Sequence, residues 1–220
     1  VSQLGPRKNL ENSISWFVEE FIDKKVGLVL KTNFKNNSIS DYDTISNHLS
    51  ALLDKYKDRK CKVYLLHGDL EPSQMTWLYQ HEKISALVNV SHGEGFGLPL
   101  FEATREGLPV VALGWSGQLD FLHHEGKDYF QSVDYTLQPI QPQAVWPGVL
   151  EKDAMWAFAD QGSYKMTLRK TLRNYKTAKK TAEQLKKIVN TKFNEEKLYA
   201  DFISALEFTQ IEEETQVVVL

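Results

Sequence analysis

The sequence predicts an α/β domain in which a parallel sheet carries helices on both faces. Short apolar runs of strand length alternate with amphipathic segments of helical period through about residue 122. Between residues 85 and 107, a buried strand, a glycine-rich loop and a helix start also follow one another directly. Right-handed crossovers bring the strand-to-helix loops of such a sheet to one edge, where ligands bind.

The strands and helices can be placed from this alternation. We expect strands at 1–5, 26–32, 61–66, 85–91, 109–113 and, less regularly, 129–137. We expect helices at 9–23, 41–57, from residue 72, 98–106, up to residue 122, and at 163–192 and 194–207. Three prolines make the rest of 128–150 irregular. Residues 1–207 then form one domain, followed by an acidic and valine-rich tail, 208–220, whose acidic half we expect to be disordered.

Composition and charge narrow the class of protein. The net charge of −3 argues against a general nucleic-acid binder, and no 18-residue apolar run predicts a membrane span. The only cysteine, Cys61, lies in a predicted strand, which favours a core residue in a reducing, cytoplasmic environment. Segment 163–192 carries ten basic residues against one acid. It could contact an anionic membrane surface, but its apolar stripe favours packing on the core with solvated lysines.

The chain is organised around residues 91–107, which join a strand to a helix. Three glycines between positions 93 and 97 let the backbone turn sharply, and Pro99 suits the first turn of a helix. Free N–H groups at such a helix start favour an anion. Two carboxylates, Glu94 and Glu102, flank this position, and they would accept hydrogen bonds from hydroxyl groups beside the anion. The pattern predicts a ligand that contains both phosphates and sugars.

Other loops are expected along the same edge. They follow the other predicted strands, near Lys8, Asn33, Gly68 and the pair Ser116 and Gly117, whose N–H groups could reach phosphate or sugar. Histidines 92, 123 and 124 have no partner ligands at metal-binding spacing, so we expect no metal.

The stretch from Glu94 to Glu102, Glu-Gly-Phe-Gly-Leu-Pro-Leu-Phe-Glu, is followed by Gly-Leu-Pro-Val-Val at 107–111. Together they resemble the E-x7-E donor-binding signature of family 4 glycosyltransferases. These enzymes have the two-domain GT-B fold, and the signature lies in their Rossmann-like, C-terminal, nucleotide-sugar-binding domain. The resemblance extends from about residue 1 to 206 and is loose between 128 and 160. The sequence Asp-Tyr-Asp at 41–43 matches the D-x-D metal motif of the other major glycosyltransferase fold, but acids are expected at that helix start.

The resemblance implies roles for the carboxylates and the loop. Glu94 would act at the reaction centre by binding hydroxyls of the transferred sugar, and Glu102 would bind the ribose hydroxyls. The backbone of Gly95, Phe96 and Gly97, with Leu98 beside it, would face the sugar and the diphosphate.

It implies further roles for the preceding segment. Lys8 matches the lysine that neutralises the leaving diphosphate. The partner arginine of the family is replaced by Gln3, and Arg7 could substitute for it from another angle. Contacts to the base would be largely backbone contacts around Gly68.

The resemblance also implies an activity. The enzyme would be a retaining hexosyltransferase that needs no metal or other cofactor and uses a UDP-, GDP- or ADP-linked sugar. The N-terminal acceptor domain of the family has no counterpart in this sequence, so we expect the chain to bind donor weakly and to transfer little by itself. Two alternatives stay open, a sugar-nucleotide epimerase of GT-B type and a non-catalytic nucleotide-sugar-binding module.

Overall fold

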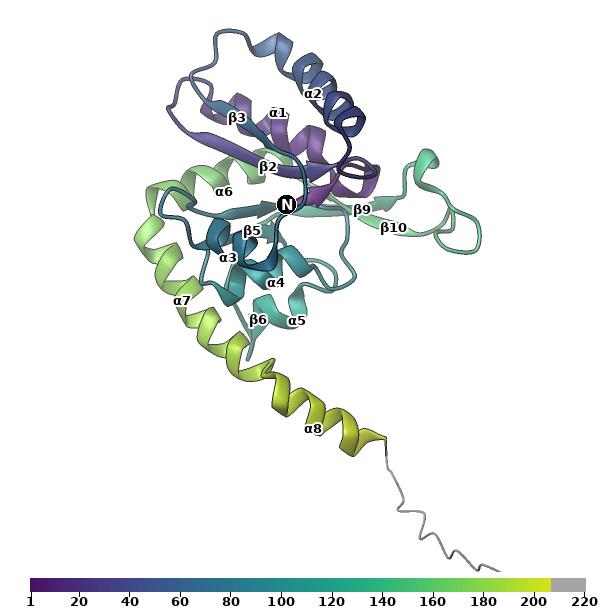
Figure 1. The fold of residues 1–220 in the computed structure, drawn as a ribbon, viewed down its shortest axis with the longest axis vertical. Coiled ribbons are helices and arrows are strands. Elements are labelled where there is room, and N and C mark those ends of the chain that lie inside the picture. The colour runs from purple at the N-terminus through teal and green to yellow at the C-terminus, as the bar shows by residue number, and fades with distance from the viewer. Residues whose placement is uncertain (207–220) are drawn as a thin grey trace, which may run out of the picture.

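The computed structural model describes residues 1–206 and confirms the parallel α/β architecture (Figure 1). Six of the described strands form two three-stranded sets in which every pair is parallel. The first set has the order β1 (Ser2–Gln3), β2 (Gly27–Asn33), β3 (Lys62–Leu66). The second has the order β4 (Leu87–Asn89), β5 (Val110–Leu113), β8 (Gln131–Val133). The sequence predicted one sheet and did not indicate this division.

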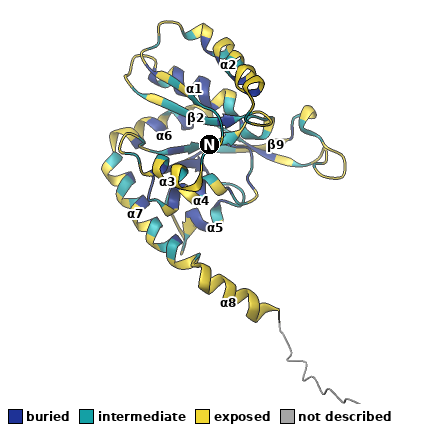
Figure 2. Ribbon diagram, in the orientation of Figure 1, coloured by how far each residue is buried: buried dark blue, intermediate teal, exposed yellow. Residues whose placement is uncertain are grey.

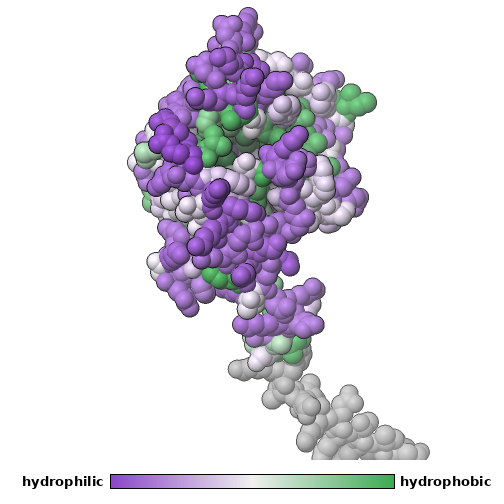
Figure 3. All heavy atoms as spheres, turned by 90° about the vertical axis from the view of Figure 1, so that its left-hand side faces the viewer, coloured by the Kyte–Doolittle hydropathy of each residue, from purple (hydrophilic) through white to green (hydrophobic). Residues whose placement is uncertain are grey.

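The two sets meet at the ends of β1 and β4. The N–H of His92 donates to the carbonyl of Arg7 at 2.8 Å, and Nδ2 of Asn9 donates to the carbonyl of Val90 at 3.2 Å. Within the described residues, β1 pairs with β2 through Thr32 and Asn33 alone. A cavity of about 300 Å³, lined largely by apolar side chains, remains between β2 and β4. On the face drawn in Figure 3, hydrophobic side chains gather in the upper half of the body within a hydrophilic surround.

Helices cover both faces of the sheet, and each face has its own core. Alternate residues of β5 point to opposite faces, with Val111 in one core and Val110 in the other. The first core packs under α1 (Leu10–Phe21), α2 (Ile39–Leu53) and α6 (Gln161–Arg173). The second packs under α3 (Pro72–Gln80), α4 (Leu98–Arg105), α5 (Leu119–Leu122) and α7 (Tyr175–Lys192). Cys61 is 2% exposed in the first core, as predicted.

The single helix predicted over 163–192 is wrong, because the chain breaks at Asn174 into α6 and α7. Asn174 has φ −106° and ψ 35°, outside the helical region, while its N–H still donates to the carbonyl of Lys170. α6 packs against α1 and β8, whereas α7 packs against α4, so one straight helix could not serve both contacts. The predicted core-facing stripe of α7 is confirmed, since Ala178, Ala182 and Leu185 are buried.

The irregular region contains a hairpin that the sequence analysis missed. The predicted strand 129–137 is divided between β8 and β9 (Tyr135–Pro139), and β9 pairs antiparallel with β10 (Met155–Ala159). The hairpin projects sideways from the body (Figure 1).

The remaining elements are short or terminal. They are η1 (Pro6–Lys8), η2 (Asp54–Tyr56), β6 (His123–His124), β7 (Lys127–Asp128), η3 (Pro142–Ala144) and α8 (Glu195–Ala205). α8 leaves the body below α7 and is exposed throughout (Figure 2). None of the helices described over 1–206 has the length and apolarity to cross a bilayer. The predicted tail 208–220 lies outside the described residues.

Candidate functional site

The glycine loop after β4 presents its backbone N–H groups at the start of α4. Gly97, the residue before the helix, has φ +87°, a left-handed conformation that favours glycine. Pro99 occupies the first turn, as predicted. The N–H groups of residues 95–98 donate no hydrogen bond to any residue between 1 and 206. A Cβ added at Gly95 would meet no atom within 4 Å, so the loop faces open space at this point. The loop can therefore accept a ligand against its backbone.

Glu94 lies at the centre of a charged cluster and is only 8% exposed. Nζ of Lys8 lies 2.6 Å from Oε1 and 2.8 Å from Oε2 of its carboxylate. Nη1 of Arg7 donates to Oε2 at 2.9 Å and also to the carbonyl of Gly93. Nδ2 of Asn89, at the end of β4, donates to Oε1 at 3.3 Å. Two cations thus share one carboxylate, which leaves a net charge of about +1 beside the free N–H groups.

The contacts of Glu94 keep its carboxylate ionised. Burial by itself raises the pKa of Glu94, but hydrogen bonds from Lys8, Ser91 and Arg7 outweigh it and lower the pKa to about 2. η1 carries both cations, and Asn9 follows them with φ 52° and with its side chain donating to the carbonyl of Val90, the residue after β4. Asn9 therefore fixes the end of η1 against the strand that leads into the glycine loop.

The loop after β5 holds the glycine loop in place. Oγ of Ser116 accepts from the N–H of Glu94 at 3.0 Å and donates to its carbonyl at 2.5 Å. The N–H of Gly117 donates to the same carbonyl at 3.1 Å. Ser116 has φ 78°, a strained conformation for a residue with a side chain. Both residues lie at the predicted site, but the N–H of Gly117 is already used within the protein.

Glu102 lies on α4 with an exposed carboxylate. The hydroxyl of Tyr79, on α3, donates to its Oε2 at 2.9 Å. Burial and the neighbouring charge of Glu102 raise the pKa of Tyr79 strongly, so the phenol stays protonated. No described residue donates to Oε1 of Glu102, which is therefore available to a ligand.

Other predicted site residues are placed differently. Nε2 of Gln3 donates to the carbonyl of Phe34 at 2.7 Å, and no hydrogen bond joins Gln3 to Lys8 or Glu94. Gly68 forms a left-handed turn with φ +97° after β3, with open space beside its Cα. The ring of Phe96 packs on Phe101 and Phe121 and is half-buried.

The remaining predicted loop residue, Leu98, has a side chain that is 62% exposed at the start of α4. It is the fourth of the residues whose N–H groups are free.

Asp41 has a structural role, as its place near a helix start predicted. Its carboxylate accepts from the N–H groups of Phe34, Lys35 and Asn36 and from Nε2 of His67. Burial opposes ionisation, but these bonds prevail and hold the pKa of Asp41 well below its usual range. Within 1–206, no three His, Cys, Asp or Glu side chains gather as metal ligands, and independence from metal stays a prediction.

His92 immediately precedes the glycine loop, and the structure buries it at 2% exposure. Its Nδ1 lies 2.8 Å from the carbonyl of Ala157, and its ring stacks on Trp156. Burial lowers the pKa of His92. The residue joins the glycine loop to the β9–β10 hairpin and reaches no side chain of the Glu94 cluster.

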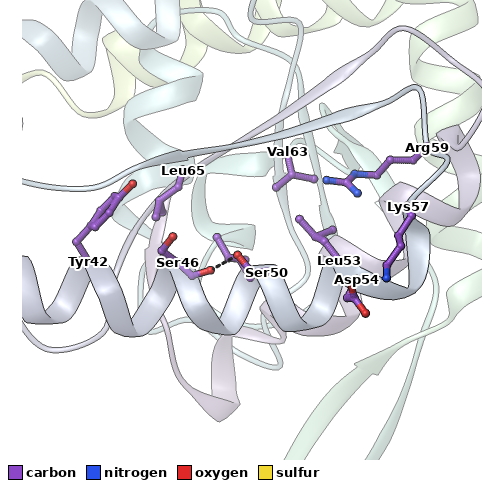
Figure 4. A pocket seen from close by; sticks show the side chains of 10 residues that line it. Tyr42, Ser46, Ser50, Leu53, Asp54, Lys57, Arg59, Val63 and Leu65 are labelled. Carbon is purple, nitrogen blue, oxygen red and sulfur yellow. Dashed lines mark hydrogen bonds and ion pairs between the residues drawn. The ribbon is translucent and has the colours of Figure 1, made fainter.

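Hollows also exist away from the glycine loop. One of about 430 Å³ lies between α2 and β3 and shares no residue with 91–107 (Figure 4). Its lining combines apolar Leu49, Leu53 and Val63 with Lys57 and Arg59. Its charges lie at one end, so it offers no converging set of polar groups like that around Glu94.

Sequence reasoning missed three contributors to the site, namely Asn89, Asn9 and Tyr79. A polar residue inside the apolar run 85–91 was a usable signal for Asn89. Tyr79 carried no signal, because an aromatic residue at helical spacing is typical of a core residue.

Structural comparison agrees with this architecture. Sucrose-phosphate synthase from Thermosynechococcus elongatus superposes with a TM-score of 0.59 at 18% identity, covering 93% of this chain and 45% of that one. HepE from Anabaena, solved with UDP and glucose, gives 0.58 at 15% identity, with 93% and 47% covered. The chain thus spans about half the length of these two structures.

The C-terminal domain of a glycosyl transferase group 1 family protein from Francisella tularensis gives a TM-score of 0.56 at 16% identity, with 88% of this chain and 83% of that domain covered. The domain is therefore that of the C-terminal half of GT-B glycosyltransferases, as predicted. No curated protein matches the sequence itself. The family model described as "Family 4 Glycosyltransferase in conflict systems" matches residues 79–200, more than half of the chain and including both glutamates. The chain therefore belongs to the family 4 glycosyltransferases, in the group described from conflict systems.

Proposed function

We propose that this chain binds the nucleotide-sugar donor of a retaining glycosyltransferase. The diphosphate lies against the N–H groups of residues 95–98, with Lys8 and Arg7 beside it. Glu102 accepts hydrogen bonds from the ribose, and Glu94 faces the transferred sugar. One observation carries the proposal: four consecutive N–H groups that donate to no residue within 1–206 adjoin a cluster of two cations and one carboxylate. HepE, which shares the fold, was solved with UDP and glucose and supports the choice of ligand.

The chemistry needs positive charge at this place. When the bond between the sugar and the diphosphate breaks, negative charge grows on the leaving oxygen, and fixed cations and N–H dipoles stabilise it. Lys8 is held at 2.6 Å from Glu94, and its side chain is 16% exposed, so it is preorganised and partly shielded from water. A diphosphate that enters would share this cation with Glu94.

The contacts of Glu94 favour a front-face path over a covalent one. A covalent retaining mechanism requires a carboxylate that attacks the sugar carbon with an unoccupied lone pair. Both oxygens of Glu94 accept hydrogen bonds from cations, which lowers their nucleophilicity. In this proposal, Glu94 binds sugar hydroxyls and supports the charge that develops on the ring, while an acceptor domain outside this sequence brings the attacking hydroxyl.

A second candidate is a nucleotide-sugar-binding module without catalysis, and the position of Gln3 favours it. The side chain that replaces the family arginine binds Phe34 and adds no charge to the diphosphate position. An epimerase has less support, because no histidine reaches the Glu94 cluster within 1–206. Release of nucleoside diphosphate from the sugar donor, measured with the full-length protein and not with this chain alone, separates the first two candidates. A catalyst releases it faster than its Glu94→Gln variant, whereas a pure binding module shows no difference.

Calorimetric titration tests the binding site directly. UDP, GDP and ADP, each free and linked to glucose, are titrated into the chain and into Glu102→Ala and Lys8→Met variants. Glu106→Ala is the matched control, because Glu106 follows the same helix and the carboxylate of Glu106 accepts a hydrogen bond from Gln80, away from the glycine loop. We expect at least one nucleotide to bind to the wild-type chain. Each site variant should lower the affinity for that nucleotide by about tenfold or more, and the control should leave the affinity unchanged. Binding that ignores both site variants, or no binding at all, would refute the assignment.

A further inference from the structure

A buried tyrosine, Tyr79, donates a hydrogen bond to the carboxylate of Glu102, one of the two glutamates of the site. Tyr79 is 4% exposed, and its ring packs in the second core with Leu87 and Leu100. Its hydroxyl leaves this core to donate to Oε2 of Glu102 at 2.9 Å. Glu102 itself is exposed, and no described residue donates to its Oε1.

This bond has consequences for a ligand. An exposed glutamate samples many rotamers, and binding has to select one of them. Tyr79 restricts that freedom before a ligand arrives, since its ring is buried in the second core. Because the phenol donates to Oε2, the free Oε1 can only accept, and it matches a hydroxyl group.

We propose that Tyr79 is a positioning residue that presents Glu102 to the ribose, so that the site selects ribonucleotides over deoxyribonucleotides. The inference rests on the proposed role of Glu102 as the ribose ligand. It adds a residue to the selectivity of the site that does not itself touch the nucleotide.

A purely packing role for Tyr79 makes a different prediction. In that case the hydroxyl would matter only for stability, and its removal would affect all ligands equally. If Tyr79 acts through Glu102, its removal affects only ligands that have ribose hydroxyls, and only while Glu102 is present.

The test uses Tyr79→Phe, which removes one oxygen and retains the ring. Tyr56→Phe is the matched control, because the hydroxyl of Tyr56 also donates to a carboxylate, Oε1 of Glu19, at 2.7 Å on the opposite side of the sheet. UDP, GDP and ADP are titrated beside their 2′,3′-dideoxy counterparts, and the Tyr79→Phe change is repeated in a Glu102→Ala background. Thermal unfolding verifies that each variant is folded.

We expect Tyr79→Phe to lower the affinity for the ribonucleotide that binds by about five- to tenfold. The affinity for the matching dideoxynucleotide should stay unchanged within about twofold. In the Glu102→Ala background the same change should have no further effect. Equal losses for both sugar types, or an effect that persists without Glu102, would overturn the role of Tyr79 while leaving the donor site intact. Wild-type protein that bound none of the nucleotides would refute the donor site and this inference together.

Discussion

Replacing Gly117 with alanine tests the contact between the two loops that form the site. A Cβ at this position would lie 1.7 Å from the carbonyl oxygen of Gly95 and 2.6 Å from its carbon. Both are backbone atoms, so a rotamer change cannot relieve the overlap. The loops must separate by about 1.3 Å, from 1.7 to 3.0 Å, before the contact becomes tolerable.

That separation breaks the bonds that hold Glu94. The N–H of Gly117 and Oγ of Ser116 both bind the carbonyl of Glu94, at 3.1 and 2.5 Å. Overpacking typically costs about 1–3 kcal/mol, and each lost hydrogen bond about 1 kcal/mol. We therefore expect Gly117→Ala to lower the free energy of unfolding by about 3–5 kcal/mol, which corresponds to about 6–20 °C in Tm for a chain of this size.

Gly95→Ala is the control, since its Cβ would meet no atom within 4 Å. We expect its urea and thermal unfolding to match the wild type within about 0.5 kcal/mol, while nucleotide binding weakens because the methyl group occupies the space of the ligand. Unfolding of Gly117→Ala that matched the wild type would show that the two loops are not in close contact, and the account of how Glu94 is positioned would be wrong.

Further expectations concern the charged groups. The pKa of Glu94, lowered to about 2, stabilises the fold by roughly 3 kcal/mol above pH 4.5. This stabilisation is lost as the pH falls toward about 2, because the carboxyl group takes up its proton at a higher pH in the unfolded chain than in the folded one. Between about pH 6 and pH 3, the free energy of unfolding measured in urea should therefore fall more steeply for the wild type than for Glu94→Gln. Lys8→Met leaves Arg7 as the only cation on Glu94 and should cost about 1–2 kcal/mol, whereas an unchanged unfolding curve would contradict the ion pair. Asp41→Ala should accelerate amide hydrogen exchange at residues 34–36, and unchanged exchange would argue against its anchoring role.

Much of the fold could be predicted because local patterns and global topology agree in this chain. The apolar runs that became β2, β3, β4 and β5 lie within one or two residues of their expected bounds. The break at Asn174 could not be predicted, since the apolar stripe continues through it and only packing on two different partners separates α6 from α7. β10 was missed because its partner β9 lies across a proline-containing loop, and periodicity does not report such pairing.

In the candidate site, too, local features could be predicted from the sequence and contacts between distant residues could not. The motif identified Glu94, Glu102 and the glycine loop, since their spacing is a local property. The contacts that keep Glu94 ionised and hold Glu102 in place are not local. Lys8 and Arg7 lie more than 80 residues from Glu94 in the sequence, and Tyr79 contacts Glu102 from another helix. Gln3 was considered for the diphosphate, and the structure directs its side chain to Phe34 instead.

Amide chemical shifts of residues 95–98 test the central claim most directly. In heteronuclear NMR spectra of the labelled chain, added UDP, GDP or ADP should shift these four amides through hydrogen bonds to the diphosphate, and Lys8→Met should weaken the response. The matching nucleosides, which lack phosphate, should leave the four amides in place. The proposed donor site would be contradicted if every nucleotide left these amides unshifted, or if nucleotides shifted only residues elsewhere in the chain.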